Sequence, residues 1–250
     1  MQLIDTHCHI HEPAYEYDAD EVIVRATSAG VGQMICVGTS EQSSQQAVAF
    51  ASGHEGVYAA IGVHPHDTKE NWRGIFDLAH APKVVAVGEI GLDYYYNHSP
   101  RDVQITALEE QLNFALRQKL PVIFHVRDAF DDFWPIFDNF SGIRGELHSF
   151  TGSKAQLEEG LKRELYVGVN GISTFTKDEN QKAMFASIPL DKMVLETDAP
   201  FLTPIPVRGK VNEPAFVRHV AEFHATVRGI SLEELAAATT TNARALFALS

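Results

Sequence analysis

The stretch Val84-Val-Ala-Val-Gly-Glu-Ile90 decides the fold class of this chain of 250 residues. Its first four residues are apolar without a break, which is typical of a parallel strand that is buried on both faces. Seven further short apolar runs occur along the chain: Gln2–Cys8, Gln33–Gly38, Val57–Val63, Pro121–Val126, Gly145–Phe150, Leu165–Val169 and Lys192–Glu196. Together the eight runs predict eight strands.

Amphipathic stretches between the runs predict helices, which we place at Arg101–Gln118, Ser153–Arg163, Asp178–Ala186 and Glu213–Ala248. The last stretch is expected to contain two helices, because Gly229 can end one helix. Ser231 and Glu234 have the spacing of a capping box for the other.

Alternation of strands and helices predicts parallel pairing, because parallel strands need crossover connections. We therefore expect an α/β fold, a (β/α)8 TIM barrel formed by residues 1–250 as a single domain. The alternative is an open doubly wound sheet, but neither a G-x-G-x-x-G nor a G-x-x-x-x-G-K-[ST] phosphate loop follows any predicted strand.

The composition restricts the class of protein. The chain has 33 acidic and 20 basic residues, so its field is negative and unsuited to non-specific binding of long duplex nucleic acid. A polyanionic substrate is still compatible, since bound divalent cations add local positive charge. Cys8 and Cys36 lie in apolar runs, no secretory signal or membrane span is evident, and nothing indicates an obligate protein partner. We expect a soluble cytoplasmic protein.

Ligand-type side chains occur at the carboxyl ends of five predicted strands. In the first strand Asp5, His7 and His9 share one face, because side chains alternate along a strand. The other candidates lie at the ends of the fourth, fifth, sixth and eighth strands: Glu89, His125, His148 and Asp198. Barrel enzymes carry their chemistry at this end of the strands.

Each candidate also has a structural interpretation when it is considered alone. A buried histidine is often a hydrogen-bonded core residue, Glu89 can be a carboxylate paired with a cation, and Asp198 precedes Ala-Pro, where a turn is expected. Four imidazoles and two carboxylates at one end of a barrel, however, would be costly to bury without a common partner. We therefore predict two divalent ions. Mixed nitrogen and oxygen donors suit Zn²⁺, Mn²⁺ or Fe²⁺ and tolerate Mg²⁺, so the metal is left open.

Several motifs also resemble the TatD-type metal-dependent deoxyribonucleases of the amidohydrolase superfamily. They span nearly the whole chain: Asp5-Thr-His-Cys-His9, Ile61-Gly-Val-His-Pro-His66, Gly88-Glu-Ile-Gly-Leu-Asp-Tyr-Tyr95, Phe124-His-Val-Arg127, His148-Ser-Phe-Thr-Gly152, Leu195-Glu-Thr-Asp-Ala-Pro200 and Asn212-Glu-Pro214. The resemblance implies a TIM barrel that cleaves phosphodiester bonds with divalent metal ions, typically from the 3′ ends of DNA. By position it implies that His7 and His9 hold one ion and that His125 and His148 hold the other. It also implies that Glu89 bridges the two ions and that Asp198 completes the site.

The resemblance also implies residues around the metal ions. His64 matches a histidine that contacts phosphate, while Asp93 and Glu196 match acidic positions around the site. The family often has arginine immediately before Asn-Glu-Pro, where this chain has Val211. Arg208 and Lys210 remain nearby, and Arg208 is the expected phosphate contact there.

These assignments give a catalytic hypothesis. A metal-activated hydroxide attacks the phosphate, with Glu89 bridging the ions and Asp198 orienting the hydroxide and accepting its proton. His64 donates a hydrogen bond to a phosphate oxygen or carries charge as imidazolium. Arg127 approaches the next phosphate or, alternatively, forms an ion pair with Asp128 or Asp131.

Two other functions use the same sequence features. The site also suits attack on an ester or amide carbon, as in hydrolysis of D-aminoacyl-tRNA, and the acidic composition favours a short substrate. A non-catalytic metal-dependent binding protein predicts a missing ligand, and none is missing. The histidines in helix or loop patterns are expected to be solvated: His54, His80, His219 and His224.

Overall fold

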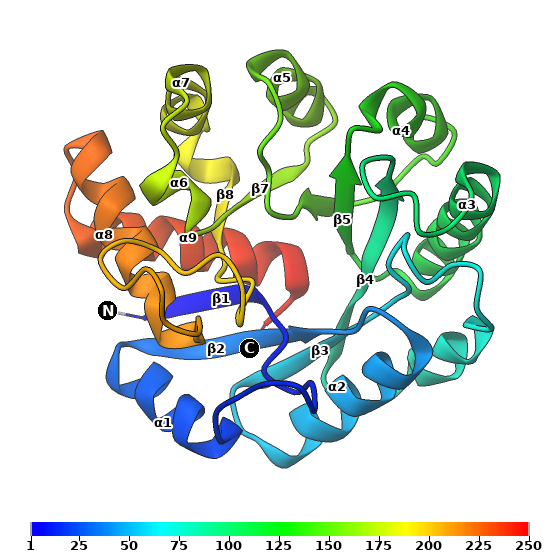
Figure 1. The fold of residues 1–250 in the computed structure, drawn as a ribbon, viewed down its shortest axis with the longest axis horizontal. Helices are drawn as coiled ribbons and strands as arrows, with labels where there is room; N and C mark the ends of the chain where they lie inside the picture. The colour runs from blue at the N-terminus through cyan, green and yellow to red at the C-terminus, as the bar shows by residue number, and fades with distance from the viewer. Residues whose placement is uncertain (1, 250) are drawn as a thin grey trace. The chain divides into compact units, whose positions relative to one another are not determined.

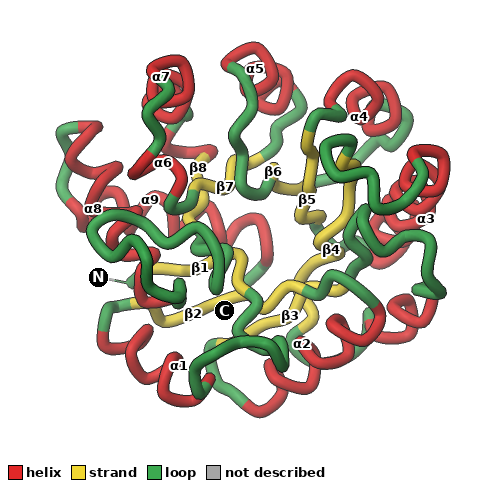
Figure 2. The backbone as a smooth tube through the Cα atoms, in the orientation of Figure 1, coloured by secondary structure: helices red, strands yellow, loops and turns green. Residues whose placement is uncertain are grey.

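The computed structural model describes residues 2–249, and its strands form one sheet whose order follows the sequence. The strands are β1 (Leu3–Cys8), β2 (Val31–Val37), β3 (Val57–Ile61), β4 (Val84–Asp93), β5 (Val122–Arg127), β6 (Gly145–Leu147), β7 (Tyr166–Val169) and β8 (Met193–Leu195). The helices are α1 (Ala19–Ser28), α2 (Glu41–Gly53), α3 (Arg101–Gln118), α4 (Phe130–Phe137), α5 (Lys154–Lys162), α6 (Ile172–Phe175), α7 (Glu179–Ser187), α8 (Val217–Arg228) and α9 (Leu232–Phe247). Short 3-10 helices occur at η1 (Arg73–Leu78), η2 (Leu190–Lys192) and η3 (Pro214–Phe216). The predicted alternation of strands and helices is confirmed (Figures 1 and 2).

The chain divides into two compact units. The first contains the chain up to Cys36 and from Ser149 onward. Within it β7 pairs with β8, and β1 pairs with β2, both in parallel. β1 also meets β8, because Cys8 bridges Ala199 and the Asp198 N–H donates to the His7 carbonyl over 2.8 Å. The carboxyl ends of β1 and β8 are therefore neighbours.

The second unit runs from Val37 to His148. Within it β3 pairs with β4, β4 with β5, and β5 with β6, all in parallel. Two buried glutamines of α3 bind the backbone at the ends of these strands. Gln111 accepts from the N–H of Val63 over 2.8 Å, and Gln104 accepts from the N–H of Asp93 over 2.9 Å. This helix thereby fixes the strand ends that carry candidate ligands.

Strand ends differ from the sequence prediction where pairing or backbone conformation intervenes. β4 continues past Ile90 to Asp93, because its last residues pair with β5. β6 ends at Leu147 rather than Phe150, and Ser149 adopts φ 45°, which is incompatible with an extended strand. Asp198 adopts φ 58°, beyond the end of β8. His148 and Asp198 thus lie beyond the ends of their strands, whereas Glu89 lies within β4.

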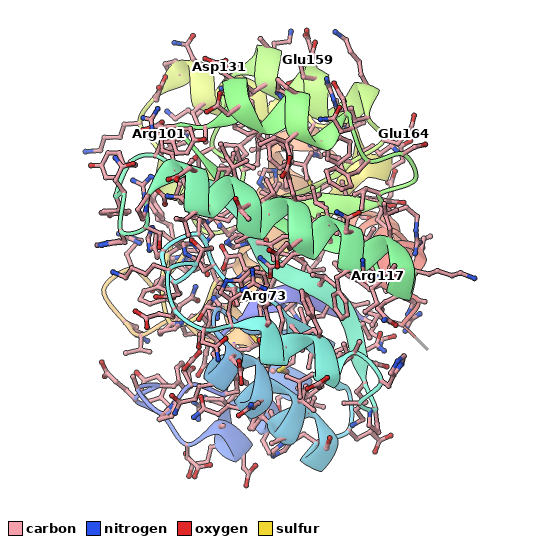
Figure 3. All side chains as sticks on the ribbon, turned by 90° about the vertical axis from the view of Figure 1, so that its right-hand side faces the viewer. Arg73, Arg101, Arg117, Asp131, Glu159 and Glu164 are labelled. Carbon is pink, nitrogen blue, oxygen red and sulfur yellow. The ribbon has the colours of Figure 1, made fainter. Side chains whose placement is uncertain are left out.

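The helices follow their sequence signals closely. The predicted helix Arg101–Gln118 is confirmed as α3, and its exposed residues Arg101 and Arg117 are labelled in Figure 3. The two predicted C-terminal helices are confirmed as α8 and α9, preceded by η3. Gly229 ends α8 with φ 66°, and the Ser231 side chain accepts from the N–H of Glu234 at the start of α9.

No helix between residues 2 and 249 is both long enough and apolar enough to cross a membrane.

Candidate metal centre

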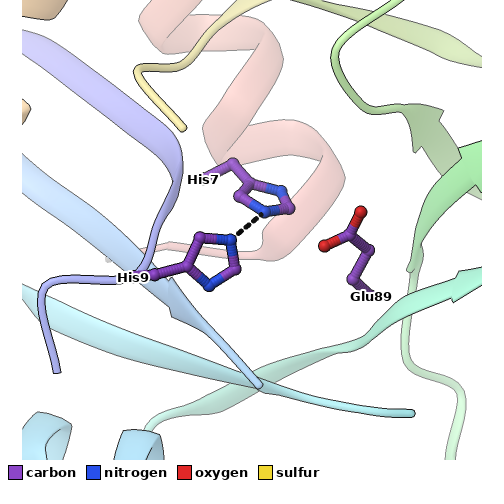
Figure 4. Close-up of side chains that lie close together, drawn as sticks. All are labelled: His7, His9 and Glu89. Carbon is purple, nitrogen blue, oxygen red and sulfur yellow. Dashed lines mark hydrogen bonds between the residues drawn. The ribbon is translucent and has the colours of Figure 1, made fainter. Parts of the chain in front are cut away.

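In the first unit, two imidazoles face each other at the end of β1. The Nε2 atoms of His7 and His9 are 3.1 Å apart (Figure 4), and both residues are buried. Two nitrogen ligands of one tetrahedral zinc ion would be about 3.3 Å apart. An Asp198 carboxylate oxygen lies 3.8 Å from the His7 nitrogen and 3.4 Å from the His9 nitrogen. These three donors therefore fit a divalent ion.

Hydrogen bonds hold the chain beside Asp198. The Asp5 carboxylate accepts from the N–H and the hydroxyl of Thr197 over 2.8 and 2.6 Å. Burial raises the pKa of Asp5 to about 8, although these hydrogen bonds act in the opposite direction. Asp198 accepts at its carbonyl from the N–H of Phe201 over 2.8 Å. Asp198 thus forms the turn that its sequence context predicts, while its carboxylate faces the histidine pair.

Two further side chains order the surrounding loops of this unit. Glu196 is fully buried and accepts from the N–H of Ser149 over 2.9 Å and from the amide of Asn170 over 3.0 Å. The side-chain amide of Asn212 donates to the carbonyls of Thr197 and Phe201. The sequence motifs place Glu196 and Asn212 near the site, and these contacts give both residues a positioning role.

In the second unit, three imidazoles face one carboxylate oxygen. Oε1 of Glu89 lies 2.8 Å from Nδ1 of His125. The same oxygen is 3.7 Å from Nε2 of His64 and 3.7 Å from Nε2 of His148. The candidate ligand atoms of His64, Glu89 and His125 all lie within 4.8 Å of one another. Nitrogen and oxygen donors at these separations fit a second metal position.

His125 is held at both ring nitrogens. Its Nε2 lies 2.9 Å from Oδ2 of Asp93, in addition to the contact of Nδ1 with Glu89. Burial lowers the pKa of His125, but the contacts with these two carboxylates outweigh it, so the pKa is raised. A metal-bound histidine keeps one ring nitrogen for a carboxylate. Asp93 is well placed to be that partner.

His64 has a different hydrogen-bond pattern. Its Nδ1 accepts from the backbone N–H of His66 over 3.2 Å, so the proton of a neutral ring lies on Nε2. Burial lowers the pKa of His64 well below its usual value. The ring is therefore neutral, and its Nε2–H is directed toward the Glu89 side of the site. In this hydrogen-bond pattern Nε2 is the donor of the neutral His64 ring.

Asp93 contacts several groups, and the sequence does not indicate that these groups form a network. Its carboxylate lies 3.0 Å from Nε2 of His66 and accepts from the N–H groups of Tyr95 and Tyr96, each over 3.0 Å. Burial raises the pKa of Asp93, but hydrogen bonds, first from His125 and then from the Tyr96 N–H, hold it well below its usual value. Asp93 is thus a charged anchor beneath His125.

The two expected phosphate-contacting arginines lie on exposed surfaces. The Arg127 guanidinium lies 4.0 Å from the ring centroid of Tyr95 and 4.8 Å from that of Tyr96. Among residues 2–249 no carboxylate is within ion-pair distance of Arg127, so the alternative ion pair with Asp128 or Asp131 is wrong. Arg208 donates to the Thr203 carbonyl over 2.8 Å and lies over Phe175.

One histidine prediction is also wrong. The sequence predicts a solvated His224, but this residue is 1% exposed, and its Nε2 lies 2.9 Å from the Ser173 hydroxyl. Burial lowers its pKa to about 3. His224 shares the buried face of α8 with Val217 and Val220, so the helical period of the sequence does indicate its burial.

Comparisons with known proteins agree with this chemistry. The model of the TatD related DNase family matches residues 4–248. The chain is 39% identical to a metal-dependent hydrolase named YabD of Bacillus subtilis, over 99% of this chain and 100% of that protein. It is 37% identical to the 3′-5′ ssDNA/RNA exonuclease TatD of Citrobacter rodentium, over 99% and 98% of the two chains. The crystal structure of YJJV, a TatD homologue from Escherichia coli K12, superposes with a TM-score of 0.91 at 31% identity, over 99% of this chain and 98% of that chain. The expected (β/α)8 fold class is therefore confirmed.

Proposed function

Because this chain belongs to the TatD related DNase family and is a metal-dependent hydrolase, we propose that it removes nucleotides from the 3′ ends of single-stranded DNA. The observation that carries the proposal is the pair of buried imidazole nitrogens 3.1 Å apart beside the Asp198 carboxylate. This arrangement suits a cation that activates water. The exonuclease name of the Citrobacter rodentium relative supports phosphodiester bonds as the target.

We propose that the donors of the two units hold two divalent ions, as Mg²⁺, Mn²⁺ or Zn²⁺. The donor geometry within each unit and the family motifs support the assignment. One ion would be held by His7 and His9 and the other by His125 and His148, with Glu89 bridging and Asp198 completing the site. When bound, such ions lower the pKa of a water molecule and neutralise charge on a phosphate.

The chain's own groups then have separate tasks. Asp198 orients the attacking water and accepts its proton. His64 donates its Nε2–H to an oxygen of the phosphate, and this donor is worth most where negative charge grows in the transition state. Arg127 and Arg208 contact neighbouring phosphates of the strand. Asp93 keeps His125 in one orientation.

We also propose that residues 1–250 act as a single domain in the cytoplasm. One family match that spans residues 4–248 supports the first statement. The free thiols of Cys8 and Cys36, whose sulfur atoms are 4.0 Å apart, support a reducing compartment.

The experiment is a gel assay on 5′-labelled single-stranded DNA with Mg²⁺, Mn²⁺ or EDTA. The proposal predicts a metal-dependent ladder that shortens from the 3′ end and is absent for Asp198→Asn. Asp191→Asn is the matched control, because Asp191 is exposed in η2 at the opposite end of β8. An inactive wild-type protein that still binds metal would direct attention to ester substrates such as D-aminoacyl-tRNA.

A further inference from the structure

Two exposed tyrosines lie side by side at the end of β4. The side chains of Tyr95 and Tyr96 are 57% and 52% exposed, and their ring centroids are 4.7 Å apart at an interplanar angle of 86°. Exposed rings that lie next to each other form a patch, and such patches can mark a binding site.

Arg127 from the end of β5 supplies a cation to the same surface. Its guanidinium covers one side of the pair, 4.0 Å from the Tyr95 centroid, and Arg127 forms no ion pair among residues 2–249. A guanidinium stacked on a ring keeps its N–H groups available at the edges, where they can meet phosphate oxygens. The surface thus combines an uncompensated positive charge with two exposed rings, of which Tyr96 also stacks on His98 with centroids 5.7 Å apart.

The tyrosines are anchored to the candidate centre by a short series of contacts. The Asp93 carboxylate binds the N–H groups of Tyr95 and Tyr96 with one oxygen and the Nε2 atoms of His125 and His66 with the other. The His66 ring lies 5.5 Å from the Tyr96 ring and 4.2 Å from the His64 ring, measured between centroids. One ring therefore separates Tyr96 from His64.

We propose that Tyr95, Tyr96 and Arg127 form a nucleobase platform on which one base of the substrate strand stacks while its phosphate reaches His64. The inference rests on the proposed function and names the part of the substrate that the chain recognises. Aromatic rings beside cationic groups are how proteins hold single strands without reading sequence, because every base has a π face. The platform therefore favours unpaired nucleic acid and tolerates any base.

The test compares base stacking in wild-type protein and in Tyr95→Ala/Tyr96→Ala. The substrates are 5′-labelled DNA strands in which each nucleotide near the 3′ end is replaced in turn by an abasic analogue. For wild-type protein, loss of the stacked base lowers kcat/KM about tenfold at one position. On the intact strand the double variant has a kcat/KM about tenfold lower than wild type, mainly because its KM is higher. Replacing the base at that position by the abasic analogue lowers its kcat/KM no further. An equal penalty in both proteins, or an unchanged kcat/KM, would overturn the proposal.

Two further variants separate stacking from other effects. Tyr95→Phe/Tyr96→Phe keeps the rings and should retain wild-type kcat/KM; a loss as large as that of the alanine pair would mean that hydroxyl groups, not stacking, are responsible. Tyr166→Ala is the matched control, because Tyr166 also lies under a cation, Lys192, but at the amino end of β7. It should behave as wild type.

Binding without catalysis distinguishes failure of the platform from failure of the proposed function. Fluorescence anisotropy of labelled oligothymidylate in EDTA should show Kd raised about tenfold in the alanine pair. If wild-type protein cleaves no DNA but this shift is observed, the exonuclease proposal fails and the platform stands. If DNA is cleaved but neither Kd nor the abasic penalty changes, the platform is wrong and the exonuclease stands.

Discussion

The protonation pattern of His64 gives the sharpest prediction about catalysis. Because Nδ1 already accepts from the His66 N–H over 3.2 Å, the Nε2 of the neutral ring carries the proton, and we expect it to donate to substrate rather than to bind a metal. His64→Ala should therefore leave the bound metal unchanged. It should remove one preorganised donor from a site where His64 is only 9% exposed. Loss of one such donor lowers kcat by about 10²- to 10³-fold, or about 3–4 kcal/mol of transition-state stabilisation.

Two replacements refine this prediction. His64→Gln places an amide N–H near the former Nε2 and should recover part of the lost kcat, whereas His64→Glu offers only acceptors and should not. The assay is steady-state cleavage of single-stranded DNA together with metal analysis of each variant. Loss of one metal equivalent in His64→Ala would refute the reasoning, because His64 would then be a ligand.

The remaining predictions concern the base, the backbone and pH. Asp198→Asn should lower kcat by about 10²- to 10⁴-fold, because it removes the general base, while the circular dichroism spectrum stays unchanged. Activity near that of wild type would exclude this role. Gly91→Ala should lower Tm by more than about 10 °C, because Gly91 has φ +154° and a Cβ there would lie 1.8 Å from the His125 carbonyl oxygen. Gly53→Ala is the control and should leave Tm unchanged, because a Cβ at Gly53 would have no atom within 4 Å. His224 has a pKa lowered to about 3 by burial; the unfolded chain binds its proton near pH 6.5, so the free energy of unfolding should fall by about 2 kcal/mol between pH 7 and 5. Urea titrations of His224→Gln should lack this component, and an unchanged pH dependence would contradict it.

Strand order and fold class are predictable from this sequence because they depend on repeated signals. Eight buried runs separated by amphipathic stretches leave few parallel topologies, and α3 follows its predicted bounds because the apolar period runs through the whole helix. Strand ends are less predictable. Ser149 turns out of β6 through a left-handed conformation, and such a conformation at a serine has no sequence signature.

The candidate ligands are predictable for a related reason. Alternation along β1 puts His7 and His9 on one face, and the family motifs extend the set to Glu89 and His125. Contacts between distant segments are not predictable in this way. Gln104 appears as an ordinary polar residue on an amphipathic helix, yet its amide is buried against Asp93. The exposure of Arg127 and its stacking on tyrosines likewise depend on how the β4 and β5 ends meet.

We propose that histidines from both units hold the catalytic ions. The decisive measurement is the number of Mn²⁺ ions that metal-free protein rebinds, determined by mass spectrometry after gel filtration. We expect two ions per chain in wild-type protein, one in His9→Ala and one in His125→Ala, each with folded circular dichroism spectra. A single ion in wild-type protein, or two ions retained in either variant, would contradict the claim.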